Sequence, residues 1–189
     1  MLSLAGCILS VILGCSYAQV FGTGKCPTVT VKSGFDINQY LGDWYEIYKF
    51  KAGFENDQVC NKANYKLKDN GHIDIFNSGF GPDGKTTSAE GDAYIPDKSD
   101  AARLKLRFAS AAPYGDYWVL DTDYESYTLI FSCTDLLFGA THFEFAWILA
   151  REKTISDDIK NKLFKQMADF KINTGNFMKS NQTSKYCTN

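Results

Sequence analysis

The sequence contains little histidine, and its basic and acidic residues nearly balance. Only His72 and His142 occur among 189 residues, and 20 basic side chains stand against 22 acidic ones, for a formal net charge of −2. A nucleic-acid-binding domain needs clustered Lys and Arg to neutralise phosphates, and no basic run is present. Two distant histidines are also too few for a histidine-rich metal site. The sequence therefore predicts no nucleic-acid partner and no bound metal.

The sequence also lacks the common motifs of catalysis. It contains no C-x-x-C pair, so neither structural zinc nor thioredoxin-like chemistry is predicted. It contains no G-x-S-x-G and no H-E-x-x-H motif. His72 follows the Asn70-Gly71 turn signal and is predicted to be an exposed turn residue, whereas His142 begins a predicted strand and could reach a bound ligand. The chain is therefore predicted not to be an enzyme and to require no cofactor.

Aromatic side chains, by contrast, are abundant. The 14 Phe, 11 Tyr and 3 Trp make up 15% of the chain, and apolar residues make up 44%. This composition predicts a compact globular protein rather than a disordered one. A length of 189 residues favours a single domain.

The N-terminal segment has the pattern of an export signal. Residues 2–13 are apolar and uncharged, and Ser16-Tyr17-Ala18 places small residues at the positions that precede a cleavage site. We predict a signal peptide at 1–18, a mature domain at 19–189 and secretion to the extracellular space. The apolar stretch is too short to span a bilayer securely, so no stable membrane insertion is predicted. As an alternative, Ile12-Leu13-Gly14-Cys15 resembles a lipoprotein box that would place a lipid anchor on Cys15.

Secretion changes the interpretation of the cysteines. Cleavage removes Cys7 and Cys15 and leaves four cysteines in the mature chain. An even number of cysteines in an exported protein predicts disulfide bonds, and four cysteines allow three pairings. The four are Cys26, Cys60, Cys133 and Cys187.

Short alternating segments, followed by one helical segment, predict the fold class. The strands are expected at 45–50, 63–67, 73–76, 89–95, 104–108, 117–120, 127–131 and 143–150. Thr154 or Ser156 can cap a helix whose apolar residues, from Ile155 to Phe170, fall on one face. The order predicts an all-β domain of about eight antiparallel strands, a sandwich or a barrel, with one C-terminal helix packed against it.

The strand faces carry unusually large side chains. Alternation places Phe143, Phe145, Trp147 and Leu149 on one face of the last strand. Aromatic side chains with an occasional polar group are typical of a pocket for an apolar ligand. The same side chains also fit the filled core of a small barrel, and the pattern alone favours that interpretation.

Three motifs in order resemble those of the lipocalin family. Gly42-Asp43-Trp44 resembles the family's G-x-W motif, Thr122-Asp123-Tyr124 its T-D-Y turn, and Arg151 its third conserved position. Segments such as Phe145–Arg151 are similar to the apolipoprotein D branch, and insect bilin-binding lipocalins and crustacyanins share much of this pattern. The resemblance covers nearly the whole mature chain.

The resemblance implies an eight-stranded antiparallel up-and-down β-barrel, closed at one end, with the C-terminal α-helix packed outside. It implies that Trp44 plugs the closed end beneath Arg151, in a cation–π contact. It selects the disulfide pairing Cys26–Cys133 and Cys60–Cys187. The residues to which it assigns structural roles are Gly42, Trp44, Thr122, Asp123, Tyr124 and Arg151.

The resemblance also implies a set of ligand-binding residues. Trp147 is expected to offer a flat stacking surface, while two tyrosines and an asparagine supply orienting hydrogen bonds. The full expected set is Tyr65, Asn77, Phe108, Tyr117 and Trp147. Outside the pocket, Asn181-Gln182-Thr183 is a sequon that predicts N-glycosylation at Asn181.

The predicted function is reversible binding and transport of a small hydrophobic ligand such as a lipid, fatty acid, steroid or retinoid. The alternative is a pigment protein whose bound chromophore is a bilin such as biliverdin, or a carotenoid. An enzyme or inhibitor built on the same barrel is a third hypothesis. The expected partner is the small ligand; a homodimer is left open, and no receptor is identified.

Overall fold

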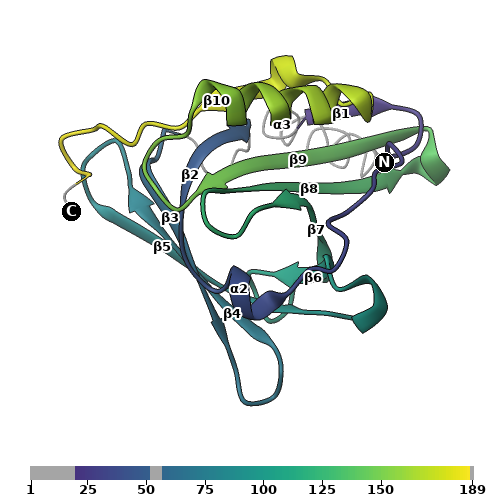
Figure 1. The fold of residues 1–189 in the computed structure, drawn as a ribbon, viewed down its shortest axis with the longest axis horizontal. Helices are drawn as coiled ribbons and strands as arrows, with labels where there is room; N and C mark the ends of the chain where they lie inside the picture. Colours follow the sequence, from purple (N-terminus) through teal and green to yellow (C-terminus); the bar gives the residue numbers. More distant parts are fainter. Residues whose placement is uncertain (1–19, 52–56, 188–189) are drawn as a thin grey trace, which may run out of the picture.

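The computed structural model describes residues 20–51 and 57–187, so the predicted signal peptide and the alternative anchor at Cys15 lie outside the described residues. In the described chain, eight antiparallel strands form a closed barrel (Figure 1). Each pairs with the next in sequence, and β9 pairs with β2 to close the ring. The strands are β2 (Gly42–Phe50), β3 (Val59–Leu67), β4 (Ile73–Phe80), β5 (Thr86–Tyr94), β6 (Arg103–Arg107), β7 (Gly115–Thr122), β8 (Tyr127–Leu136) and β9 (Thr141–Ala150). All eight predicted strands fall on these, and the predicted fold class is confirmed.

Two short strands, which the sequence did not predict, extend the sheet where β2 leaves its neighbours. β1 (Val20–Thr23) pairs with the first half of β9, beside the part of β9 that pairs with β2. β10 (Phe177–Lys179) pairs with the end of β2, beyond the part of β2 that pairs with β3. The chain then continues onto β3, where Cys60 N donates to Asn181 O at 2.9 Å. The C-terminal segment therefore bridges β2 and β3 where these strands part.

The predicted helix is α3 (Asp157–Asp169), which lies outside the ring of strands (Figure 1). Ser156 is its N-cap, because the Ser156 hydroxyl accepts a hydrogen bond from Ile159 N at 3.2 Å. Leu163 and Met167 are fully buried against the outer faces of β8 and β9. In the described residues, no helix combines the length and the apolar character needed to cross a membrane.

A short helix, α2 (Ile37–Tyr40), precedes β2 and helps to close one end of the barrel. Trp44 is completely buried there, and its indole Nε1 donates to Tyr40 O at 2.8 Å. The Arg151 guanidinium lies 3.7 Å from the centre of the Trp44 ring, within the range of a cation–π contact. It also donates to Asp43 O at 2.8 Å and to Tyr124 O at 3.0 Å. Arg151 thus connects β2, α2 and the β7–β8 turn through hydrogen bonds.

The T-D-Y residues form that turn between β7 and β8. The Thr122 hydroxyl donates to Tyr127 O at 2.7 Å and accepts from Tyr124 N at 2.9 Å. Asp123 Oδ1 accepts hydrogen bonds from three backbone amides, those of residues 125–127. Burial raises the pKa of Asp123, but these backbone bonds outweigh it and the pKa is lowered overall. Tyr124 in this turn has a left-handed φ of 69°. Gly42, the first residue of β2, has a φ of 94°, a value that favours glycine.

Two disulfides join the chain ends to the barrel. Cys26–Cys133 attaches the N-terminal segment to β8, and Cys60–Cys187 attaches the C-terminal segment to β3. This is the pairing that the resemblance implied. Because the two bonds connect residues 107 and 127 positions apart, each restricts a long loop of the unfolded chain.

Candidate ligand-binding cavity

The barrel encloses a cavity of about 440 Å³. Side chains from all eight barrel strands line it, and most of the lining is apolar, with aliphatic groups such as Ile75 and Leu149 beside aromatic ones such as Trp147. This volume lies within the range typical of small-molecule sites. The interpretation of the aromatics as a completely filled core is therefore wrong.

The structure brings all five predicted ligand-binding residues to this one cavity. Tyr65 and Tyr117 lie deep inside, and their hydroxyls are 2.7 Å apart. Asn77 comes from β4 and Trp147 from β9, whereas Phe108 follows β6 and is 43% exposed. Their placement is thus established, while their contact with a ligand stays a prediction.

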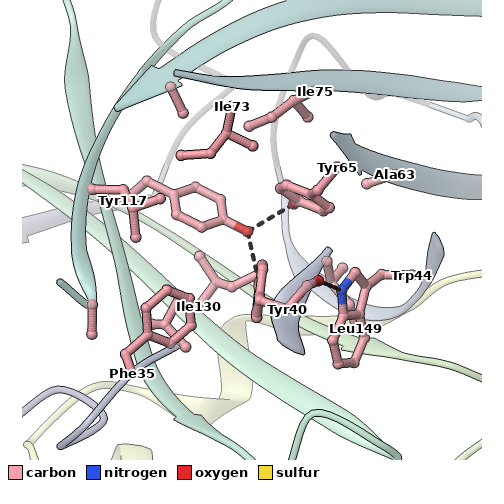
Figure 2. Close-up of a cluster of buried hydrophobic side chains, with 14 residues drawn as sticks. Phe35, Tyr40, Trp44, Ala63, Tyr65, Ile73, Ile75, Tyr117, Ile130 and Leu149 are labelled. Carbon is pink, nitrogen blue, oxygen red and sulfur yellow. Dashed lines mark hydrogen bonds between the residues drawn. The ribbon is translucent and has the colours of Figure 1, made fainter. Parts of the chain in front are cut away.

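A chain of hydrogen-bonded hydroxyls crosses the floor of the cavity (Figure 2). Tyr117 stands at its centre, with its hydroxyl 2.7 Å from that of Tyr65 and 3.0 Å from that of Tyr40. Thr128 donates to Tyr40 at 3.3 Å. Burial raises the pKa of Tyr40 to about 12, against the lowering effect of its hydrogen bonds. Burial likewise raises the pKa of Tyr117 well above its usual value. We call Phe35, Tyr40, Trp44, Tyr65 and Tyr117 the floor cluster.

Above the floor, one wall of the cavity is polar. Glu46 on β2 and Asn61 on β3 both line the cavity and are only 5% and 8% exposed. Asn61 Nδ2 donates to Glu46 Oε1 at 3.1 Å, and the Ser180 hydroxyl donates to the same oxygen at 2.6 Å. Lys49 Nζ forms an ion pair with Glu46 Oε1 at 3.1 Å. We call Glu46, Asn61 and Asn77 the polar wall.

Glu46 and Asn61 are not among the ligand-binding residues predicted from the sequence. Strand alternation contained the signal, because Glu46 lies two residues beyond inward-facing Trp44 and Asn61 four residues before inward-facing Tyr65. The C-terminal contribution of Ser180 and Gln182 had no such signal. The Gln182 amide donates to Glu46 O at 2.9 Å and to Asn61 O at 2.7 Å, which ties the two strands together behind the wall.

His142 does not reach the cavity, so the expectation that it could contact a ligand is wrong. It lies on the opposite face of β9 from Trp147, where its Nδ1 is 2.9 Å from Gly24 O. Its ring packs against Gly22 of β1, at a place where any Cβ would clash. His142 therefore belongs to the contact between β1 and β9.

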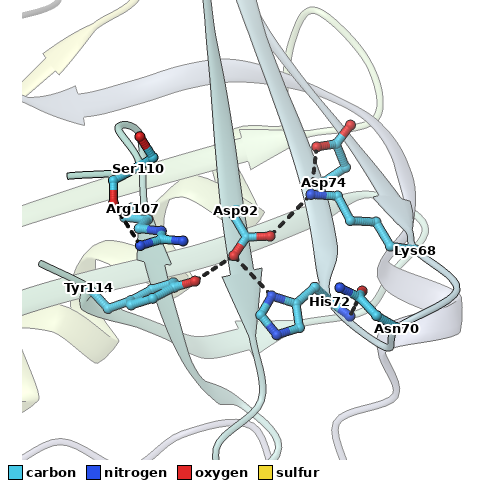
Figure 3. Close-up of polar contacts among 8 residues, drawn as sticks. All are labelled: Lys68, Asn70, His72, Asp74, Asp92, Arg107, Ser110 and Tyr114. Atoms are coloured by element: carbon cyan, nitrogen blue, oxygen red, sulfur yellow. Dashed lines mark hydrogen bonds and ion pairs between the residues drawn. The ribbon is translucent and has the colours of Figure 1, made fainter. Parts of the chain in front are cut away.

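On the outside of the barrel, Asp92 is surrounded by polar side chains that contact its carboxylate (Figure 3). It accepts from Tyr114 at 2.5 Å, contacts His72 Nδ1 at 2.9 Å and accepts from Lys68 at 3.1 Å. The hydrogen bond from Tyr114, followed by those from His72 and Lys68, holds the pKa of Asp92 far below its usual range. Such a carboxylate is a poor general base. The group joins the β3–β4 turn, β5 and the β6–β7 loop, and it does not line the cavity.

The sequon at Asn181 lies at the surface. Asn181 is exposed, and its side-chain oxygen accepts from Thr183 N at 3.0 Å. Gln182 between them is buried in the strand contact described above. Glycosylation of Asn181 stays a prediction.

A closed barrel of eight antiparallel strands, with an internal cavity, a Trp–Arg closure and one outer helix, defines the lipocalin class of folds. The model of the lipocalin-like domain family matches residues 35–182. This match covers most of the chain, and the chain therefore belongs to the lipocalin family.

Comparison with known proteins gives the same family. Apolipoprotein D of Rattus norvegicus is 44% identical over 133 residues, which are 70% of this chain and 69% of that protein. The structure of insecticyanin from Manduca sexta has a TM-score of 0.77 and 26% identity, and the match covers 90% of this chain and 93% of that one. H1 crustacyanin from the lobster Homarus americanus has a TM-score of 0.75 and 24% identity, with 87% and 91% covered, and this likeness concerns the fold alone.

Proposed function

We propose that the protein is a secreted carrier that binds a small hydrophobic ligand reversibly in the barrel cavity. The observation that carries the proposal is the cavity of about 440 Å³, whose mostly apolar lining includes a few polar groups. This combination is typical of sites that bury an apolar molecule and orient it by a few hydrogen bonds. The two disulfides support export, since such bonds persist in oxidising compartments. The proposal involves no covalent step.

Trp147 provides the test, because the chain offers a matched control. Trp147 lines the cavity, whereas Trp118 on β7 lies on the outer side of the barrel, with the Arg103 guanidinium 4.6 Å from its ring centre. We expect Trp147→Ala to weaken binding of retinol by about 1–2 kcal/mol, roughly 5–30-fold, through loss of an aromatic contact. Fluorescence titration would measure this. Trp118→Ala should leave the affinity unchanged, and equal affinities of Trp147→Ala and the parent protein would contradict the proposal.

A bilin or carotenoid chromophore is the second candidate ligand. It is supported by a row of rings on β9, where Phe145 lies 5.7 Å from Trp147 and 5.8 Å from Phe143, centre to centre. The Phe145 and Trp147 rings are stacked within 19° of parallel, a surface that suits a flat conjugated molecule. The likeness to insecticyanin supports the same candidate. Protein purified from its natural source should then show a visible absorption band, and a colourless preparation would count against a pigment.

A further inference from the structure

We propose that the polar wall selects ligands whose polar end is an uncharged hydrogen-bond donor, a hydroxyl or an amide N–H, and disfavours the free carboxylic acid of the same chain. This inference rests on the proposed carrier function and names the chemistry of its ligand. It follows from which atoms of the wall are paired and which are not.

The unpaired polar atoms of the wall are all acceptors. Among the described residues, three buried side-chain atoms have no hydrogen-bond partner, and each is an amide oxygen: Asn61 Oδ1, Asn77 Oδ1 and Gln182 Oε1. The first two belong to residues that line the cavity, but Asn61 Oδ1 packs against Gly79 of β4, which leaves Asn77 Oδ1 as the acceptor of the wall for a ligand. The orientation of the Asn61 amide is fixed, because its Nδ2 already donates to Glu46 and a turned amide would place two oxygens together. A buried acceptor without a partner is unfavourable, so a ligand that supplies a donor gains affinity there.

The charge of the wall also disfavours an acid. Glu46 is the buried carboxylate of the cavity lining, and it lies beside Leu149 in the barrel, two residues above Trp44. A second carboxylate brought near it would have to share Lys49 with Glu46, and in a space shielded from water the two carboxylates would repel each other more strongly than in bulk water.

The nearby cations are already held by carboxylates of the protein. Lys49 is committed to Glu46 at 3.1 Å, makes a further contact, and is absent from the described cavity lining. Lys62 also lines the cavity, and its Nζ is 3.2 Å from the Asp43 carboxylate. A ligand carboxylate would therefore meet an acceptor-rich wall whose neighbouring cations are already paired.

The inference can be tested with three ligands that differ only at the polar end. Dodecanol, dodecanamide and dodecanoate would compete at pH 8 against a fluorescent apolar probe bound to the full mature protein. We expect the alcohol and the amide to bind at least about tenfold more tightly than the acid, the effect of about 1.4 kcal/mol. Glu46→Gln should bring the acid to within about threefold of the alcohol, because it removes the opposing charge and releases Lys49.

Two further variants separate the causes. Asn77→Leu removes one unpaired acceptor and should weaken the alcohol and the amide while leaving the acid unchanged. Glu90→Gln is the matched control, since Glu90 is an exposed carboxylate of β5 that does not line the cavity, and it should preserve the preference.

The outcomes distinguish this inference from the carrier function. Tight binding of all three ligands without preference overturns the inference and supports the carrier function. A preference that persists unchanged in both Glu46→Gln and Asn77→Leu also overturns the inference. Failure of all three ligands to bind overturns both. Asn77→Leu keeps the test decisive if Glu46→Gln does not fold.

Discussion

The floor cluster and the polar wall both lie inside the barrel, yet their hydrogen bonding differs. In the floor cluster, the Trp44 indole and the hydroxyls of Tyr40, Tyr65 and Tyr117 all have partners. In the polar wall, the carbonyl oxygens of Asn61 and Asn77 have none among the described residues. The floor hydroxyls thus bond to one another, whereas the wall has amide oxygens without a partner among the described residues.

This difference separates stability from binding. A fully paired, close-packed group stabilises the fold and has no missing hydrogen bond for a ligand to supply, although Tyr65 and Tyr117 also line the cavity. An incompletely paired group lowers stability slightly and gains from a ligand that completes it. The most recognisable residues, Trp44 and Arg151, accordingly belong to the closed end, and the residues that we expect to choose the ligand lie in the less distinctive wall.

Removal of the Trp44 side chain from the floor cluster should have the largest effect on stability. Trp44→Ala deletes a completely buried side chain, its hydrogen bond to Tyr40 O and the surface on which Arg151 lies. We expect a loss of about 3–5 kcal/mol in the free energy of unfolding, typical of large aromatic truncations in a core. For a domain of this size that corresponds to a fall in Tm of roughly 6–20 °C, measurable by circular dichroism.

If Trp44→Ala kept the full stability of the parent protein and lost only ligand binding, the assignment of Trp44 to stability would be wrong. Trp118→Ala is again a useful reference, because it makes the same change on the outer side of the barrel, where the ring is only partly buried. Its loss of stability should be smaller than that of Trp44→Ala.

Alkaline pH should act on the floor through its tyrosines. The folded-state pKa of Tyr40 is about 12 against an ordinary value of 10.0, so the unfolded chain loses this proton first. The stabilising contribution is therefore complete below pH 10 and is lost as the pH rises towards 12. A shift of this size corresponds to about 3 kcal/mol. Unfolding free energies measured between pH 9 and pH 12 should fall steeply, and less steeply in Tyr40→Phe.

The tyrosinate absorbance gives an independent measure. Exposed tyrosines should ionise first, and Tyr40 and Tyr117 only as the protein unfolds. A single ionisation step near pH 10 in the folded protein, with every tyrosine participating, would show that the floor is open to solvent.

The sequence was sufficient for the strands and the helix, because strand alternation and turn residues are local signals, whereas the choice of a barrel over a sandwich came from the family resemblance. Asn70-Gly71 marked the β3–β4 turn correctly, and the apolar face of 155–170 marked the helix, whose cap is Ser156 rather than the alternative Thr154. The three family motifs placed Trp44 and Arg151, which are 107 residues apart in sequence, in one contact. Residue patterns alone would not have paired them.

The sequence was insufficient where a contact depends on the path of distant segments. Leu67 lies on the same face of β3 as Tyr65, but it is the last residue of the strand. It extends beyond the closed end of the barrel and is 47% exposed. His142 lies on the outer face of β9, where β1 covers it. The polar wall depends on Ser180 and Gln182 reaching across from the C-terminal segment, and nothing in their local sequence indicates that position.

The smallest effect on stability is expected at the polar wall, and it has the opposite sign to the others. Asn77→Leu replaces a side chain whose buried oxygen has no partner with an apolar one of similar size. Without ligand, the free energy of unfolding should stay the same or rise by up to about 1 kcal/mol, as urea denaturation of the empty protein would show. A loss of more than about 1 kcal/mol would mean that Asn77 is a structural residue like those of the floor. Unchanged or increased stability of Asn77→Leu, together with weaker binding of dodecanol, would show that Asn77 contributes to ligand binding and not to the stability of the fold.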